Sequence, residues 1–457
     1  RWCSCTSRAV PSGRGSPMRV VHITAGAGGR ICGSCLHDNT LVRALRARGL
    51  DAILLPAYVP TTTDEQNVAE PQIVLGGLNV YLQEHLAVFR HTPWFLDRLL
   101  DRRWLLEWLS SRTGTTTPAD LGRLTASTLA GETGRQAKEI EKLARRLARE
   151  PRPDVVHLSN VLLSGLARRI RQTTGAGIVA TLSGEDLFVE GIPEPWYTKI
   201  RSLLRQRAAD IDRFVALNGF FAEFMADYLG LHRSRIEIVP HGIDTAGFPE
   251  TPPDLAARRS GPLRVGFLAR ACPEKGLHLL VEAVGLLRAN RDVELLAAGA
   301  SVAAEADYLR RCRERAESLG IAEDVRWLGQ VDRRGKLDLL SQVDLFAMPT
   351  THPEAKGLPV LEAMAAGVPV VAPRHGCFPE YLGGQEERHG GEACGVGHAP
   401  GDAASLAAAI GELADDPQRA AACGRSGHAL ARRRHSWEAM AGGHEEVYRA
   451  VARPTSL

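Results

Sequence analysis

Short apolar runs alternate along most of the chain with longer stretches in which apolar residues recur every three or four positions. The short runs predict buried strands, and the longer stretches predict helices that cover them. This alternation is typical of parallel sheets built from βαβ units. Strands are predicted at residues 19–24, 51–57, 155–158, 177–182, 214–217, 236–239, 263–268, 293–298, 325–328, 344–348 and 368–372.

A proline-rich break at residues 245–262 divides the strands into two series. It contains four prolines, which indicates an interdomain linker. We therefore predict an α/β fold of two doubly wound, Rossmann-like domains, at 18–244 and 263–435, that face each other across a cleft. Ligands are expected at the carboxyl ends of the strands. A last helix and tail, 436–457, complete the chain.

Two segments depart from this rhythm. Residues 1–17 lack both a hydrophobic period and the apolar centre of a signal peptide, so we expect a disordered extension with Met18 as the natural first residue. The first domain also carries a helical insertion at about 83–150, in which leucine and tryptophan recur every four residues between 94 and 108. That apolar face favours packing against its own domain, and a membrane surface or the acceptor cleft is the alternative partner.

Composition narrows the class of protein. The 457 residues are 44% hydrophobic, which suffices for two or three cores. The net charge of +3 is close to balance and gives no reason to expect a nucleic-acid partner. Nine cysteines, an odd number without regular spacing, favour a reducing cytoplasm over a disulfide framework. No uninterrupted apolar run of 18 residues occurs, so we expect no membrane span.

The strongest candidate for chemistry is the stretch 349–373, where Glu354 and Glu362 stand eight positions apart. A helix that begins near Leu358 places Glu362 about one turn inside it and Glu354 in the preceding loop. The free N–H groups at the start of that helix suit an anion, and the carboxylates can accept hydrogen bonds from hydroxyls on either side of it. Taken alone, the pair favours a solvated loop acid followed by an ordinary helix-surface glutamate, and only its context changes that interpretation.

This stretch, PEAKGLPVLEAMAAGVPVVA, resembles the Glu-x7-Glu signature of the family 4 glycosyltransferases, retaining enzymes of the GT-B fold, with Ala355-Lys356 where Gly-Phe is commoner. LARACPEKGLHLLVEA, at 268–283, is similar to a second segment of the family. VPHGID, at 239–244, is similar to a third, with His241 where the family commonly has Asn. The similarity spans about 18–450 and is specific. It implies a GT-B fold whose C-terminal helix crosses back to the N-terminal, acceptor-side domain.

The resemblance also implies roles for residues of the second, donor-binding domain. Arg270 and Lys275, in the turn after its first strand, would meet the negative charge on the leaving diphosphate, and Glu354 would orient the donor sugar. Contacts with the nucleotide and its phosphates are implied for Glu362, Gly357, Leu358, Pro359, Gln330 and Val331. Because cationic side chains and the helix dipole supply the positive charge, no metal and no other cofactor is expected beside the nucleotide-sugar co-substrate.

In the first domain, Gly28 and Gly29 match a glycine pair that in the family approaches the donor phosphate. A dinucleotide-binding reading of this loop is rejected, because Ile31 stands in the place of the third glycine. The candidates on the acceptor side are Ser183, which replaces a common His, together with Glu185, Asp186 and Asn218. The last three are also compatible with closing turns and capping helices.

Cys32 and Cys35 form a single Cys-x2-Cys pair. A structural zinc site needs a second pair of ligands, so packed thiols are favoured over a metal or redox role.

These observations predict a metal-independent retaining glycosyltransferase that moves a hexose from a UDP- or GDP-linked donor to a glycan, lipid or small-molecule acceptor. It would act in the cytoplasm, with peripheral membrane contact if the 94–108 helix reaches a bilayer. Two alternatives stay open. A GT-B sugar phosphorylase would release no nucleotide, and a non-catalytic sugar-nucleotide binder would agree with Ser183 and the altered glycine loop.

Overall fold

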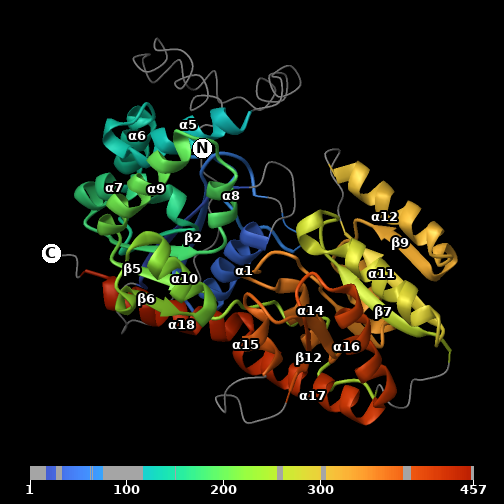
Figure 1. Cartoon of the computed structure of the whole chain (residues 1–457). Helices are drawn as coiled ribbons and strands as arrows, with labels where there is room; N and C mark the ends of the chain where they lie inside the picture. The colour runs from blue at the N-terminus through green and yellow to red at the C-terminus, as the bar shows by residue number, and fades with distance from the viewer. Residues whose placement is uncertain are drawn as a thin grey trace.

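The structure is a computed structural model that describes residues 17–26, 33–61, 63, 65–75, 117–149, 151–254, 261–299, 305–383 and 393–453. Four predicted features lie outside these residues: the extension as far as residue 16, the Gly28-Gly29 pair, Cys32 and the 94–108 helix. The described chain forms two α/β halves, the first blue to green and the second yellow to red in Figure 1.

Each half is built on a parallel sheet, and in the described residues each sheet has six strands. The order in the first is β2 (Asp51–Pro56), β1 (Arg19–Thr24), β3 (Val155–Leu158), β4 (Gly177–Leu182), β5 (Arg213–Ala216) and β6 (Ile236–Ile238). The order in the second is β12 (Gly395–His398), β11 (Val370–Pro373), β10 (Leu345–Ala347), β7 (Leu263–Leu268), β8 (Val293–Ala298) and β9 (Val325–Gly329). Both are doubly wound, as the alternating pattern predicted.

Eleven of these strands coincide with predicted ones to within about two residues. In β3 and β4 the side chains on both faces of the sheet are buried. This explains why these strands appear in the sequence as continuous apolar runs and not as a strict alternation of apolar and polar residues. The strand β12 was missed. In its sequence, GVGH, glycine alternates with one valine and one histidine, so there is no apolar run that would predict a strand.

Helices cover both faces of each sheet. In the first half they are α1 (Gly33–Ala47), α5 (Pro118–Leu129), α6 (Ala137–Leu147), α7 (Ala167–Thr174), α8 (Asp186–Glu190), α9 (Trp196–Arg207) and α10 (Gly219–Leu229). In the second half they are α11 (Leu277–Arg288), α12 (Ala306–Ser318), α13 (Arg333–Gln342), α14 (Leu358–Ala365), α15 (Phe378–Leu382), α16 (Ala403–Asp415) and α17 (Pro417–Arg434), and α18 (Trp437–Val451) follows them in the chain. Short 3-10 turns lie at Gly131–Thr133, Val161–Leu166, Ala208–Asp210, Arg233–Arg235, Pro273–Lys275 and Ala322–Asp324.

The strand orders locate where ligands should bind. In the second sheet the chain runs from β7 outward to β8 and β9 and then returns to β10 on the other side of β7. The crevice outside the carboxyl ends of β7 and β10 is therefore the switch point at which doubly wound sheets bind ligands. The predicted residues Arg270 and Lys275 follow β7, and Glu354 follows β10. In the first sheet the switch point lies between β1 and β3.

The last helix, α18, crosses back to the first half, as expected for a GT-B fold (Figure 1). Its buried residues Met440, Val447 and Tyr448 share a hydrophobic core with Val20 of β1 and Leu41 of α1. Burial of these apolar side chains stabilises the packing of the C-terminal helix on the N-terminal half. The chain thus passes between the two halves twice, once at the linker and once at α18.

Candidate active site

The site is organised around the start of α14. Gly357 is the residue before the helix and has φ 61°, a left-handed conformation that favours glycine. A Cβ there would also lie 2.8 Å from Cε2 of Tyr381. Pro359 occupies the first turn, where its missing N–H costs nothing. The helix begins at Leu358 as predicted, so Glu362 lies about one turn inside it.

Glu354, in the loop before α14, forms an ion pair with Lys275. The pair depends on a close approach of two chain segments at Gly276, where a Cβ would lie 1.8 Å from the carbonyl oxygen of Pro349. Because Gly276 has no side chain, the turn after β7 packs directly on the segment after β10. Residues 79 positions apart thereby share one site.

Charge pairing keeps the Glu354 carboxyl ionised. Burial alone would raise its pKa, but the nearby Lys275 and Lys356 ammonium groups and the hydrogen bond from Lys275 outweigh that effect, and the pKa is lowered. Arg270 lies on the other side of the same turn, where its Nε is 3.2 Å from Oε1 of Glu305. About half of the Arg270 side chain is exposed, so it can turn toward an anionic ligand.

Glu362 has a partner that the sequence reasoning missed. The ammonium of Lys336, in the first turns of α13, lies 2.7 Å from Glu362 Oε1, and both residues are buried. Lys336 shares its helix face with the buried Leu339 and Leu340. A lysine on an apolar helix face must pair with a buried acid, and that pattern is the signal that could have revealed it.

The remaining donor-side candidates frame α14. Gln330 and Val331 form the connection between β9 and α13, and Gln330 is exposed. Asp332 caps α13 by accepting from the N–H of Gly335 at 2.8 Å, which sets the direction of that connection. Leu358 is buried beneath the first turn of α14, so its backbone and not its side chain is available to a ligand.

In the first half, Ser183, Glu185 and Asp186 follow β4 and lead into α8. The carboxylate of Glu185 accepts from the backbone N–H groups of Ser183 at 2.7 Å and Val161 at 3.4 Å. Burial raises the pKa of Glu185 and of Asp186. Glu185 therefore holds two loops together, the closing role that the sequence left open.

Asn218 joins the two halves. Its Oδ1 accepts from the N–H of Phe221 at 2.9 Å and caps α10, while its Nδ2 donates to the carbonyl of Ala355 at 2.7 Å. Glu380, which the sequence reasoning did not single out, accepts from the first N–H groups of the same helix, at 3.0 Å from Gly219. A carboxylate at a helix N-terminus is favoured by the helix dipole. The start of α10 is thus anchored to the second half.

Three further observations bear on the predictions. Cys35 is buried within α1, which agrees with a packed thiol. Among the described residues, no group of three or more His, Cys, Asp or Glu side chains is arranged to hold a metal ion. None of the helices in that part of the chain combines the length and apolarity that crossing a membrane requires.

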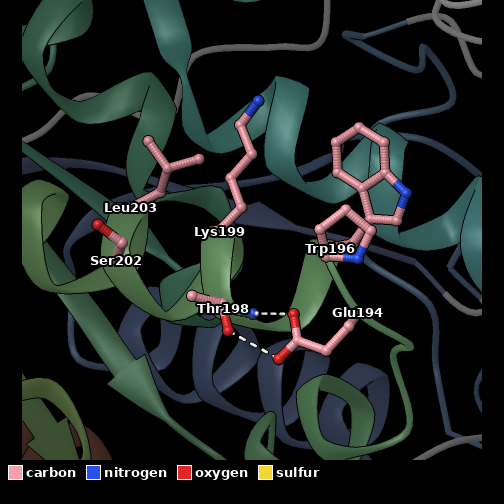
Figure 2. Close-up of a pocket in the computed structure, with 7 residues that line it drawn as sticks. Glu194, Trp196, Thr198, Lys199, Ser202 and Leu203 are labelled. Carbon is pink, nitrogen blue, oxygen red and sulfur yellow. Dashed lines mark hydrogen bonds between the residues drawn. The ribbon is translucent and has the colours of Figure 1, made fainter.

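A surface hollow of about 620 Å³ lies along α9, between Glu194, Trp196, Lys199 and Leu203 (Figure 2). None of its lining residues belongs to the predicted donor or acceptor site. By contrast, Glu362 and Leu358 line a narrow cavity between the halves, opposite Thr40, Glu65 and His241 of the first half.

Comparison with known proteins agrees with this geometry. Residues 255–429 match the family model described as glycosyl transferases group 1, and residues 124–246 match the model described as glycosyltransferase family 4. The phosphatidyl-myo-inositol mannosyltransferase of Mycobacterium leprae is 30% identical over 310 residues, which cover 65% of this chain and 74% of that protein. The glycogen synthase of Mycobacterium tuberculosis is 28% identical over 310 residues, covering 66% of this chain and 70% of that protein.

Among solved structures, HepE of Anabaena in complex with UDP and glucose superposes with a TM-score of 0.65 at 18% identity, covering 95% of this chain and 100% of that chain. Two facing doubly wound halves, with Glu354 just before and Glu362 just inside a helix start at the switch point, have the GT-B fold. The chain belongs to family 4 of the glycosyltransferases and is a hexosyltransferase that uses a nucleotide-sugar donor.

Proposed function

We propose that the protein is a metal-independent, retaining glycosyltransferase that acts in the cytoplasm and takes its hexose from a UDP- or GDP-linked donor. The acceptor would be a glycan, a lipid or a small molecule carrying a free hydroxyl. The observation that carries the proposal is the pairing of Lys275 with Glu354, in front of the start of α14 at the switch point of the second sheet. An ionised carboxylate and an ammonium then lie together just before the first turn of α14.

The chemistry assigned to each group follows from its charge. The diphosphate would lie against the backbone N–H groups that follow Lys356, with Lys275 and Arg270 supplying positive charge as the sugar–phosphate bond breaks. The Glu354 carboxylate would accept from hydroxyls of the sugar, and Glu362, held by Lys336, from those of the ribose. Retention would follow if the acceptor attacks from the face that the diphosphate leaves, with the leaving phosphate taking the acceptor proton.

The relatives indicate which donors to test first. The Corynebacterium glutamicum relative is named as GDP-mannose-dependent, and the HepE complex holds UDP and glucose. Calorimetric titration of UDP, GDP, ADP and their hexose-linked forms into the wild-type protein and Glu362→Ala is therefore the decisive experiment. Binding of one base series by the wild type, weakened at least tenfold in the variant, supports the proposal. A wild-type protein that binds none of these ligands refutes it.

Turnover separates the enzyme from its alternatives. With the donor that binds, the wild type should release nucleoside diphosphate in the presence of a suitable acceptor, and the product should keep the anomeric configuration of the donor. Release of sugar 1-phosphate without a nucleotide would instead identify a phosphorylase.

A further inference from the structure

Lys356 reaches from the second half to the first. Its ammonium lies 2.7 Å from Oγ of Ser34, in the first turn of α1, and the residue is only partly exposed. Within the residues that the structure describes, the ammonium makes no ion pair. A half-buried charge whose only close partner is a neutral hydroxyl is poorly compensated for the water it has lost.

The other two lysines of the site are compensated. Lys275 is paired with Glu354, and Lys336 is paired with Glu362. Two carboxylates do lie within electrostatic range of Lys356, namely Glu354 and Glu185. Each is already engaged, the first by Lys275 and the second by backbone N–H groups of the β4–α8 loop. The charge of Lys356 therefore has no dedicated partner in the described protein and suits an anion from outside it.

Two helix starts converge on the same place. A Cβ on Gly33, the first residue of α1, would lie 3.7 Å from Cδ of Lys356 and 3.8 Å from Cδ1 of Leu358, the first residue of α14. The positive ends of both helix dipoles thus lie close together, beside an ammonium. The two positive helix ends and the Lys356 ammonium repel one another, and a polyanion bound beside them would offset this repulsion.

We propose that Lys356 binds the diphosphate of the nucleotide-sugar donor and acts as a third cation, beside Arg270 and Lys275, on the leaving group. This inference rests on the proposed function. The ammonium exchanges the Ser34 hydroxyl for a phosphate oxygen when the donor binds. As transfer proceeds, the bond from the anomeric carbon to the phosphate oxygen breaks with its electron pair on the diphosphate, and the acceptor oxygen forms the new bond. The acceptor proton passes to the diphosphate, and Lys356 stays protonated throughout.

The position of Lys356 distinguishes this chain from the motif that it resembles, where an aromatic residue is commoner. A phenylalanine cannot donate to phosphate, whereas a lysine adds a charge-assisted hydrogen bond. Lys275 and Lys356 both belong to the second half, and Lys356 reaches Ser34 of α1, so the diphosphate would be held where the two halves meet.

The test measures the affinity of the nucleoside diphosphate and monophosphate of the preferred base, by calorimetry, for wild type, Lys356→Met, Lys356→Arg and the control Lys199→Met. Lys199 is an exposed lysine of α9. We expect Lys356→Met to weaken diphosphate binding about 10- to 100-fold, the factor for one charge-assisted hydrogen bond, and monophosphate binding less than threefold. Lys356→Arg should retain most of the affinity, and Lys199→Met all of it. Ser34→Ala should leave diphosphate binding intact, because the hydroxyl is displaced in the complex.

Several outcomes overturn the inference. Equal diphosphate affinity in wild type and Lys356→Met would do so, as would an equal loss for the mono- and diphosphate, which would assign Lys356 to holding the halves together. A defect that appears only with anionic acceptors would place the anion on the acceptor instead. If the wild-type protein binds no nucleoside diphosphate, the proposed function itself is refuted. This outcome is distinguishable from failure of the inference, because the wild type then gives no binding signal before any variant is compared.

Discussion

Acidification should destabilise the protein through a cluster of buried histidines under α18. The rings of His22 and His157 have centroids 4.4 Å apart, those of His37 and His241 4.6 Å, and those of His157 and His444 5.5 Å. All five are almost completely buried, and they come from β1, β3, α1, α18 and the segment after β6. A proton on His37, His157, His241 or His444 places a positive charge among neighbouring rings in a dry environment.

The size of the effect follows from the pKa values. Burial lowers the pKa of His241 to about 3 and that of His444 to about 4, against about 6.5 for an unfolded histidine. Between these values the unfolded chain binds a proton that the folded protein does not, so stability falls as the pH falls. Between pH 7.5 and pH 5.5, each of these two histidines lowers the free energy of unfolding by about 1.3 kcal/mol. Burial also lowers the pKa of His37 and His157, which adds a loss of the same sign.

The substitution His241→Asn isolates one of these contributions. Asparagine is commoner at this position in the motif that VPHGID resembles, and it can replace the ring N–H that lies 2.9 Å from the carbonyl of Gly242. We expect the variant to lose about 1.3 kcal/mol less unfolding free energy than wild type between pH 7.5 and 5.5. Buried carboxyls whose pKa is raised, such as Glu65 and Glu185, act in the opposite direction. They are common to both proteins and cancel in the comparison.

Urea unfolding followed by tryptophan fluorescence at the two pH values measures the difference. The matched control is His232→Asn, at an exposed ring that caps a short 3-10 turn. If His241→Asn shows the same pH-dependent loss as wild type, the buried neutral histidine is not a source of acid sensitivity and the reasoning is refuted.

Three further predictions concern the site. Glu354→Gln removes the negative charge of the side chain but keeps its shape. We expect at least about 100-fold lower turnover, with nucleoside diphosphate binding retained. Wild-type turnover in steady-state kinetics would contradict the role of Glu354 in orienting the donor sugar. Lys336→Met should destabilise the protein by about 3 kcal/mol, because the buried Glu362 loses its ammonium, and adding Glu362→Gln should recover part of this loss in urea titrations. A double variant no more stable than Lys336→Met would argue against the pair. Gly357→Ala should cost about 1–3 kcal/mol through its left-handed backbone and the approach to Tyr381, and an unchanged melting temperature would disprove that strain.

The fold and the centre of the site were predictable because they rest on local patterns. Buried parallel strands leave apolar runs, and the start of α14 is marked by Gly357 before Leu358-Pro359. The strand β12 was not predictable, because glycine occupies half of its positions and its burial comes from the neighbouring β11. The Lys336–Glu362 pair joins residues 26 positions apart on two helices, and such contacts depend on packing that no single segment specifies.

Polar residues after strands were harder to interpret, because caps and ligand contacts use the same chemistry. Glu185 and Asn218 both follow strands of the first sheet at their carboxyl ends, where ligand-binding residues are expected. In the structure Glu185 accepts backbone N–H groups, and Asn218 caps α10. A carboxylate or amide near a free N–H will bind it whenever no ligand competes, so the sequence alone could not rank these uses.

The loop before α14 has two functions that cannot be independent. The proposed function assigns Glu354 and Gly357 to the donor site, while the residues between them contact the other half of the protein. Ala355 is buried in the core of the first half and its carbonyl accepts from Asn218, and Lys356 reaches Ser34. Any movement that separates the halves must therefore pull on the segment that orients the sugar and the phosphates. Conversely, a donor that fixes this segment stabilises the contacts across the gap, because both depend on the same few backbone torsions. Donor binding and closure of the two halves are thus expected to strengthen each other in this enzyme.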